Sequence, residues 1–349
     1  MKTSDFDYDL PPEFIAQTPI EPRDSSRLLV LKRDAGTLEH RIFGEIGQYM
    51  RPGDLLVLNQ TRVIPARIYA RKLTGGRVEL LLLRREDDLT WETLVGGKGL
   101  EAGKRVEVED GPAAEIVEAL DGSRRRVRFS EPIEPYFPRV GHVPLPPYIH
   151  APLKDPERYQ TVYAHDPGSA AAPTAGLHFT PRLLDDLQTQ GVRIAYVTLH
   201  IGLDTFAPVT EDHPEGHRIH TEWCQLPQET ADVINQTRQS GGRIVAVGTT
   251  SVRTLESAAQ TATDDRPQTI VHRLSSIVQP FIGPTSLYIL PGYKFTLVDC
   301  MITNFHLPKS TLIMLVGAFA GREWVLNAYE IAKQNGYRFY SFGDAMLIL

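Results

Sequence analysis

Three histidines lie where predicted strands give way to loops or where loops lead into predicted helices. They are His178 in AAPTAGLHFT, His200 in VTLHIGLDTFAPV and His306 in MITNFHLPKST. Ligands of α/β sheets bind at the carboxyl ends of the strands, where such loops gather. Histidine exchanges a proton near neutral pH and therefore suits acid–base catalysis there. One such histidine is more often structural, but three at successive junctions favour a shared site.

The stretch VAVGTTSVRTLES places polar groups at a further junction, between a predicted strand and a predicted helix. Gly248, Thr249, Thr250 and Ser251 would present backbone N–H groups and hydroxyls there. Such groups bind an oxyanion, a carboxylate or a ribose. An ordinary capped helix start explains them equally well. A Rossmann dinucleotide site is not indicated, because the stretch lacks GxGxxG.

Lys309-Ser310-Thr311 resembles the end of a phosphate-binding P-loop, but the residue before the lysine argues against that function. A P-loop has glycine at this position, so that bare backbone wraps the phosphate. This chain has Pro308, which has no backbone N–H to donate. Two alternatives remain. Either Ser310 caps the apolar helix that follows while Lys309 is solvated, or Lys309 and His306 flank an anionic or ribose-bearing ligand.

The segment DHPEGHRIHTEW brings His213, His217 and His220 close together in the sequence. Pro214 and Gly216 disfavour the helix that would put the first two histidines on one face. The spacing also matches no zinc signature, so we expect no bound metal. The competing interpretations are a polar loop, or a loop that hydrogen-bonds to substrate. A metal-dependent hydrolase centred on these three histidines is kept as the alternative function.

The composition indicates an ordinary globular chain whose 349 residues suit two domains. The net charge of −6 argues against a uniformly basic surface, although a local basic face is enough to contact RNA. Cys224 and Cys300 lie outside any CxxC pair, which favours a reducing compartment. The N-terminal segment lacks the features of a signal peptide, and no apolar run is long enough to span a membrane. We therefore expect a cytoplasmic monomer without membrane contact.

The positions of these residues depend on two predicted domains. Segment 61–150 has short apolar runs separated by Gly-containing turns, which predicts a small β-barrel. Two basic clusters lie in it, Arg84-Arg85 and Arg124-Arg125-Arg126. We favour a solvated strand face for them over a phosphate site.

Segments 1–60 and 151–349 are predicted to form one discontinuous α/β domain into which the barrel is inserted. Strand and helix signals alternate after residue 150, which is typical of helices packed on a largely parallel sheet. A hairpin is expected over 27–43. The expected helices are 180–191, 227–242, 310–321 and 324–336, and the further strands are 192–202, 243–247, 286–293 and 297–305.

Long motifs in this chain resemble those of the S-adenosylmethionine:tRNA ribosyltransferase-isomerases of queuosine biosynthesis. The resemblance covers nearly the whole length and is weakest in the barrel. The motifs that carry it are FDYDLPPEFIAQTP, GDLLVLNQTRVIPARI, AAPTAGLHFT, HRIHTEW, AVGTTSVRTLES, GYKFTLVDCMITNFHLPKSTLIMLVGAFAG and YRFYSFGDAMLI. The HIGLDTF motif departs from the family at Asp204, where glycine is expected, while His200, Gly202 and Phe206 are retained.

The resemblance implies a specific reaction and an α/β domain with an inserted β-barrel. The family transfers the ribosyl part of S-adenosylmethionine to 7-aminomethyl-7-deazaguanine at the wobble position of tRNA. The sugar is rearranged to an epoxycyclopentane, which gives epoxyqueuosine, and adenine and methionine leave. S-adenosylmethionine is consumed as a substrate, and no metal or redox cofactor is expected.

Roles for individual residues follow as hypotheses. His178 or His306 serves as the base, and His200 or His220 assists. The Gly248–Ser251 loop and Arg253 hold the donor, with Arg253 on the methionine carboxylate. Phe179 or Phe305 stacks on adenine or the deazaguanine. The residues predicted to face tRNA phosphate are Lys309, Arg62 and Arg67.

Overall fold

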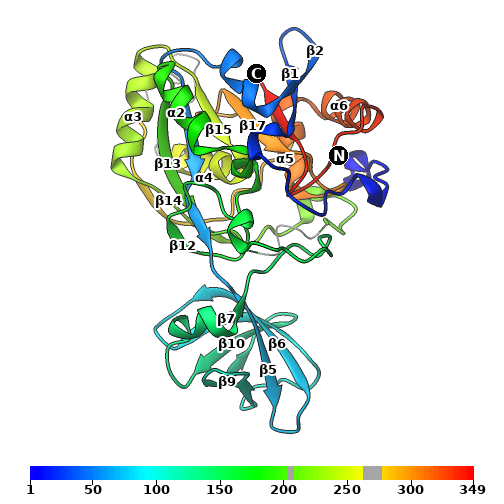
Figure 1. Ribbon diagram of the computed structural model, residues 1–349, viewed down its shortest axis with the longest axis vertical. Helices are drawn as coiled ribbons and strands as arrows, with labels where there is room; N and C mark the ends of the chain where they lie inside the picture. The colour runs from blue at the N-terminus through cyan, green and yellow to red at the C-terminus, as the bar shows by residue number, and fades with distance from the viewer. Residues whose placement is uncertain (203–207, 262–276) are drawn as a thin grey trace. The chain divides into compact units, whose positions relative to one another are not determined.

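The computed structural model describes residues 1–202, 208–261 and 277–349. The chain forms two compact units (Figure 1). The larger unit contains 1–61, 147–166 and 172–349, and the smaller contains 62–146 and 167–171. No helix in the described ranges is long and apolar enough to cross a membrane. Residues 203–207, and Asp204 and Phe206 with them, lie outside the described part of the chain.

The larger unit is built on a nine-stranded sheet. The strand order is β16-β14-β13-β3-β15-β17-β18-β1-β2. The bounds are β1 Arg27–Lys32, β2 Thr37–Ile42, β3 Leu55–Asn59, β13 Arg193–Leu199, β14 Glu222–Leu226, β15 Ile244–Val247, β16 Phe281–Thr285, β17 Cys300–Asn304 and β18 Ala345–Ile348. A separate two-stranded pair joins β4 (Thr61–Val63) to β12 (Asp166–Ser169).

The sheet is mixed, which corrects the expectation of a largely parallel one. Its four central strands β13, β3, β15 and β17 run parallel. In contrast, β14 is antiparallel to β13, β16 to β14, and β18 to β17. Neighbouring parallel strands need a crossover connection, usually a helix. The described residues between β13 and β14 contain only a 3₁₀ turn, so that pair is antiparallel.

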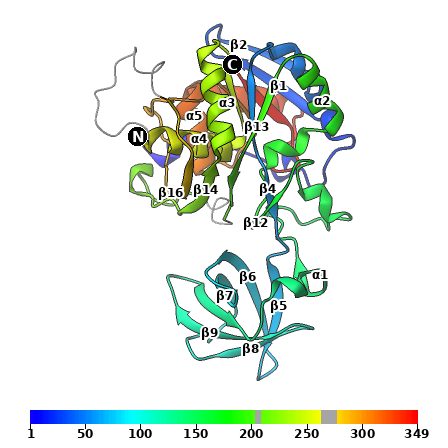
Figure 2. The same ribbon diagram turned by 90° about the vertical axis from the view of Figure 1, so that its left-hand side faces the viewer.

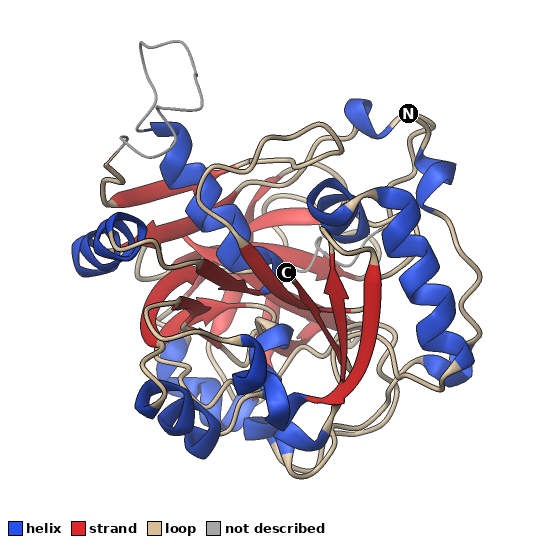
Figure 3. Cartoon of the chain, turned by 90° about the horizontal axis from the view of Figure 1, so that it is seen from above, coloured by secondary structure: helices blue, strands red, loops and turns tan. Residues whose placement is uncertain are grey.

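Helices cover both faces of this sheet (Figure 3). One core contains the apolar side chains of α3 (Gln228–Gln239), α4 (Gly248–Thr261), α5 (Thr311–Ala320) and α6 (Arg322–Gln334). The other contains those of α2 (Pro181–Thr189) and of the 3₁₀ helices η4 (Phe43–Tyr49) and η7 (Thr174–His178). The remaining short helices are η1 Thr3–Phe6, η2 Pro12–Phe14, η3 Arg23–Ser25, η5 Glu134–Tyr136, α1 Phe137–Val140, η6 Pro156–Tyr159 and η9 Pro214–Gly216. The α/β class is confirmed.

Two predicted helix starts are confirmed by their caps. The Thr180 hydroxyl accepts from Leu183 N at 3.1 Å at the start of α2. The Ser310 hydroxyl accepts from Ile313 N at 3.3 Å at the start of α5. A side-chain oxygen at this position satisfies a backbone donor that has no partner within the helix. Ser310 is therefore the cap of an apolar helix, one of the two alternatives left by the sequence.

The predicted strand over 286–293 is wrong. Strand β16 ends at Thr285, whose hydroxyl accepts from the backbone N–H of Leu287 at 3.2 Å. A threonine hydroxyl bonded to nearby backbone competes with a β-ladder. The apolar side chains after it still pack on the core, but from a loop. Burial of those side chains produced the strand-like pattern.

Glu256 links α4 to the segment that leads into β17. It is fully buried, and its carboxylate accepts backbone N–H bonds from Thr296, Leu297 and Val298 at 2.9–3.1 Å. The Tyr293 hydroxyl donates a fourth bond at 3.0 Å. Burial raises the pKa of Glu256, and these hydrogen bonds act in the opposite direction. One buried carboxylate thus fixes the helix and the strand against each other.

The smaller unit is a closed antiparallel β-barrel of six strands, as expected (Figure 2). The strands are β5 Arg67–Lys72, β6 Arg77–Arg85, β7 Thr90–Gly96, β8 Arg105–Val108, β9 Ala113–Ala119 and β10 Arg124–Phe129. Pairing of β5 with β8 closes the ring, and β11 (Gly141–His142) adds to β5. Alternate side chains such as Ile68, Leu80 and Ile116 fill the interior.

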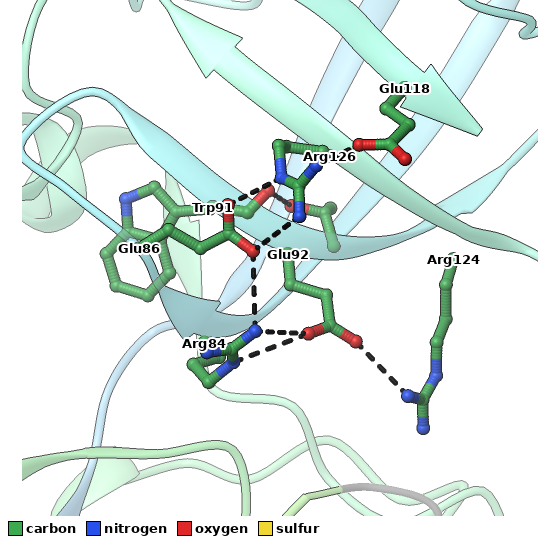
Figure 4. A network of polar contacts seen from close by, with 8 residues as sticks. Arg84, Glu86, Trp91, Glu92, Glu118, Arg124 and Arg126 are labelled. Atoms are coloured by element: carbon green, nitrogen blue, oxygen red, sulfur yellow. Dashed lines mark hydrogen bonds and ion pairs between the residues drawn. The ribbon is translucent and has the colours of Figure 1, made fainter. Parts of the chain in front are cut away.

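The basic clusters of the barrel are largely neutralised by glutamates (Figure 4). Arg126 pairs with Glu86 at 2.6 Å and also with Glu118. Glu92 belongs to β7, and it accepts from Arg84 on β6 and from Arg124 on β10, each at 3.2 Å. Opposite charges placed across neighbouring strands stabilise a sheet modestly. These contacts agree with the solvated strand face predicted for the clusters.

Candidate active site

A pocket of the α/β unit lies at the carboxyl ends of its central strands. It encloses about 610 Å³. Its walls come from the β15–α4 junction, the end of β17, the start of α5 and the segment before η7. The lining residues are Tyr148, Ala172–Ala175, Ile201, Gly248–Thr250, Thr303–Leu307, Ser310, Leu312, Tyr340 and Ser341. None of these described residues is Asp, Glu, Lys or Arg, so hydroxyls, amides and one imidazole determine the polarity.

Helix α4 begins at the pocket without an intervening turn. Gly248 has φ +84°, a left-handed conformation that glycine adopts without strain, and it lets β15 pass directly into the helix. The first N–H groups of a helix carry partial positive charge. Asn59 at the end of β3 donates to Thr250 Oγ1 at 3.1 Å and so fixes the hydroxyl at this junction. The arrangement suits an acceptor-rich ligand such as a ribose or a carboxylate.

His306 is the histidine that lines this pocket. Its Nε2 lies 2.7 Å from Thr303 Oγ1, and its backbone is held by the hydroxyls of Tyr329 and Tyr8. No partner of Nδ1 is found among the described residues. Burial lowers the pKa of His306 to about 3, so the ring is neutral at physiological pH. If Nε2–H donates to Thr303, Nδ1 has a free lone pair.

His178 lies behind the pocket wall and reaches the pocket only through Asn304. Asn304 donates to His178 Nε2 at 3.2 Å and to the Tyr340 carbonyl at 3.1 Å, while its own carbonyl accepts from Thr174. His178 Nδ1–H therefore donates to Ser26 Oγ at 2.7 Å. Both ring nitrogens are engaged, and the side chain is only 4% exposed. His178 can orient Asn304, but it has no free nitrogen for substrate.

We expect His178 to make the protein less stable in acid. Burial lowers its pKa to about 3, with Arg338 and Arg23 adding to the effect. The unfolded chain binds this proton near pH 6.5 and the folded chain does not, so stability falls as the pH falls through 6.5. Because of this group, the free energy of unfolding should be about 2 kcal/mol lower at pH 5 than at pH 7.

Urea unfolding at the two pH values measures this cost. His178→Gln should reduce the acid destabilisation by about that amount, because glutamine does not titrate. His213→Gln serves as the matched control, since His213 is exposed, and should leave the difference unchanged. An acid destabilisation that is equal in wild type and His178→Gln would contradict the assignment.

A second pocket adjoins the first and shares Leu312 with it. It contains Arg253 and His220, two of the predicted residues, together with Glu222. Arg253 forms an ion pair with Glu222, and its Nε donates to the Leu287 carbonyl at 3.1 Å. The pocket also contains His217, Ile219, Leu287–Ile289, Thr311 and Leu315.

The other predicted donor-binding and catalytic residues are mostly buried in the core or lie outside the lining of the two pockets. Ser251 is buried, and its hydroxyl donates to the carbonyl of Val247 at the end of β15. Phe179 is fully buried in the core behind η7, and the Phe305 ring packs among core aromatics, although the residue lines the first pocket. Both side chains are 0% exposed. His200 stacks on Trp223, with Nδ1 2.8 Å from Thr61 Oγ1, and lines neither pocket.

None of the three residues predicted to contact RNA is among the lining residues of the two pockets. Lys309 forms an ion pair with Asp7 at 2.7 Å and has φ +56°. Arg67, on β5, pairs with Glu79 at 3.0 Å. Arg62 follows directly on Thr61 in β4 and belongs to the smaller unit.

Two histidines of the DHPEGHRIHTEW segment, His217 and His220, line the second pocket, and His213 does not. His213 Nδ1 bonds to the Met1 carbonyl at 3.0 Å, and His217 Nδ1 to Glu211 at 2.9 Å. His220 lies at the second pocket. Within the described residues, no group of three His, Cys, Asp or Glu side chains is arranged to hold a metal ion. The segment therefore gives the metal-dependent hydrolase no support.

Sequence reasoning assigned no binding role to two polar residues of the pockets. Asn304 is the residue at the end of β17 whose amide joins the first pocket to His178, and Glu222 begins β14 beside Arg253. Both lie inside motifs already singled out for their histidines. An asparagine at a strand end and a glutamate in an apolar strand were the available signals, since polar residues at such positions need buried partners.

The fold and the pockets define an α/β enzyme that carries an inserted β-barrel. A family model described as "Queuosine biosynthesis protein" matches residues 3–348. S-adenosylmethionine:tRNA ribosyltransferase-isomerases of Symbiobacterium thermophilum and Thermotoga maritima are 52% and 49% identical, over the full length of both chains. A crystal structure of S-adenosylmethionine tRNA ribosyltransferase from Thermotoga maritima aligns over 99% of this chain and 100% of its own, with 41% identity and a TM-score of 0.56.

The chain belongs to the queuosine biosynthesis family of S-adenosylmethionine:tRNA ribosyltransferase-isomerases. The resemblance stated from the motifs is therefore confirmed over the whole length.

Proposed function

We propose that this protein transfers the ribosyl part of S-adenosylmethionine to 7-aminomethyl-7-deazaguanine at the wobble position of tRNA. The sugar is isomerised to the epoxycyclopentane of epoxyqueuosine, and adenine and methionine are released. Full-length membership of the family supports this reaction. The observation that carries it is the first pocket, where a neutral imidazole faces hydroxyls, amides and a helix N-terminus.

The pocket chemistry suits a donor that is itself a cation. The sulfonium acidifies the protons on ribose C5′, and a base must remove one of them before adenine is expelled. A protonated histidine would repel the sulfonium and could not accept that proton. His306 stays neutral because of its burial, and its Nδ1 is assigned as the base. Thr249 and Thr250 at the start of α4 are assigned to the ribose hydroxyls.

Asn304 and His178 are assigned as positioning residues. Asn304 lines the pocket, and its amide is held in one orientation by a donor and two acceptors. Exclusion of water from the reacting sugar protects the ylide, and the buried apolar helix α5 behind the pocket serves this purpose.

The reaction is tested by product analysis on tRNA that carries the aminomethyl-deazaguanine base. Adenine and methionine should appear in equal amounts, together with epoxyqueuosine in the tRNA. A methylated RNA with S-adenosylhomocysteine would instead identify a methyltransferase. Binding of tRNA without adenine release would leave only an RNA-binding protein. Full activity after chelation would exclude the metal-dependent hydrolase.

Lys309 is retained as a proposed phosphate contact. The side chains of Lys309 and its partner Asp7 are 42% and 47% exposed. An exposed ion pair contributes roughly 0–1 kcal/mol, so Lys309 loses little stabilisation when it exchanges Asp7 for a phosphate. We expect Lys309→Ala to reduce the slope of log K against log salt for tRNA binding by about 0.7–0.9. Lys294→Ala is the comparison variant, and an unchanged slope in Lys309→Ala would remove Lys309 from the RNA interface.

A further inference from the structure

Arg253 is a buried cation with an unused hydrogen-bonding edge. The residue belongs to α4, is only 6% exposed and lines the second pocket. Nη1 pairs with Glu222 and Nε donates to the Leu287 carbonyl. Nη2 is buried and has no hydrogen-bond partner in the described part of the chain. A buried donor of this kind carries a desolvation cost unless a ligand satisfies it, and a guanidinium edge fits a carboxylate.

Glu222 places a negative charge beside this edge. It is 7% exposed, and its Oε1 accepts from the Gly202 backbone N–H at 3.0 Å. The Glu222 carboxylate is negatively charged and lines the second pocket beside the Arg253 guanidinium, so it can attract an ammonium group. A cation and an anion side by side complement a zwitterion, because neither ligand charge is then left without a counter-charge.

The remaining walls of the pocket are mainly apolar. Leu287, Ile289 and Leu315 contribute aliphatic surface, and Leu312 separates this pocket from the first. The unbranched methylene chain that joins the sulfonium of the donor to its amino acid would pack against such a wall. The helix that begins at the first pocket with Gly248 carries Arg253 in its second turn, so the two pockets have a fixed spacing.

We propose that Arg253 and Glu222 form a clamp for the α-amino-acid end of the donor. Arg253 binds the carboxylate and Glu222 the ammonium, while the adenosyl part lies in the first pocket. This inference rests on the proposed function and deepens it. It explains why a charged pair is buried beside an otherwise uncharged pocket. Because the clamp binds the amino-acid end of the donor and not its sugar, it selects a donor that carries both the carboxylate and the ammonium group.

The test compares S-adenosylmethionine with its decarboxylated analogue, with adenine release from modified tRNA as the readout. Wild-type protein should prefer the intact donor in kcat/KM by roughly 10- to 100-fold, the effect of one charge-assisted hydrogen-bonded pair. Arg253→Met should lose this preference. The variant should have a lower kcat/KM for the intact donor, while its kcat/KM for the decarboxylated analogue should stay within about threefold of the wild-type value. Glu222→Gln should lose discrimination against the deaminated analogue in the same way.

Two further variants keep the test decisive. Arg253→Met/Glu222→Met removes both charges and avoids an unpaired buried carboxylate if the single variant is unstable. Arg243→Met is the matched control: Arg243 pairs with buried Asp54 at 2.5 Å at the other end of β15, so its loss should lower stability and keep the donor preference. Equal use of both donors by wild type, or a preference that survives in the Arg253 variants, overturns the clamp. Absence of adenine release with either donor overturns the proposed function instead.

Discussion

Replacement of His306 by alanine is expected to lower kcat for adenine release by about 10²- to 10⁴-fold, the usual contribution of a general base. His306 is the histidine that lines the first pocket, and its Nδ1 has no partner among the described residues. Its neutral state comes from burial, so the loss should be similar at pH 6 and pH 8. Single-turnover adenine release on modified tRNA gives the rate of the chemical step directly.

Two companion variants separate this role from general damage. Thr303→Val keeps the size of the side chain but removes the hydroxyl beside Nε2, so it should lower kcat less and leave KM for the donor unchanged. His213→Asn, in an exposed loop, should retain wild-type turnover. If His306→Ala keeps turnover within threefold of wild type, the base is another group.

The second large effect is on stability. Glu256→Ala should lower the free energy of unfolding by about 3–5 kcal/mol, because it leaves several buried donors unsatisfied and opens a cavity. The donors are the backbone N–H groups of Thr296, Leu297 and Val298 and the Tyr293 hydroxyl. The melting temperature of the α/β unit should fall by roughly 10 °C. Calorimetry or chemical denaturation measures the change.

Glu118→Ala is the matched control for Glu256. Glu118 is a half-exposed glutamate of the barrel network, and loss of an exposed ion pair should change stability by about 1 kcal/mol or less. Glu256→Gln should lie between wild type and Glu256→Ala, because an amide retains only one acceptor oxygen. A Glu256→Ala protein as stable as wild type would mean that this carboxylate does not hold α4 to the segment before β17.

The strand-end positions of the site were accessible from the sequence because they depend on local signals. Gly248 follows a short apolar strand, and Ser310 precedes an apolar helix, and both lie where the patterns predict. The failed strand at 286–293 has the same apolar pattern, but a loop packed on the core produces it too. Periodicity reports burial, and only pairing distinguishes a strand from a buried loop.

Which histidine faces the pocket was not accessible from the sequence. His178 and His306 lie in equivalent motifs, and both have a lowered pKa. They differ in their partners: His178 is satisfied on both nitrogens by Ser26 and Asn304, and His306 on one. Those partners are up to 152 positions away along the chain, so no local pattern encodes them.

The sequence by itself determined the family, the α/β class and the inserted barrel, because long motifs and the hydrophobic period of each segment are local properties. Only the tertiary structure decided the mixed strand order, the separate pockets, and the pairing of Arg253 with Glu222. These features arise when residues far apart in the chain are buried together, where each buried polar group requires a partner. The choice of partner is made by packing in three dimensions.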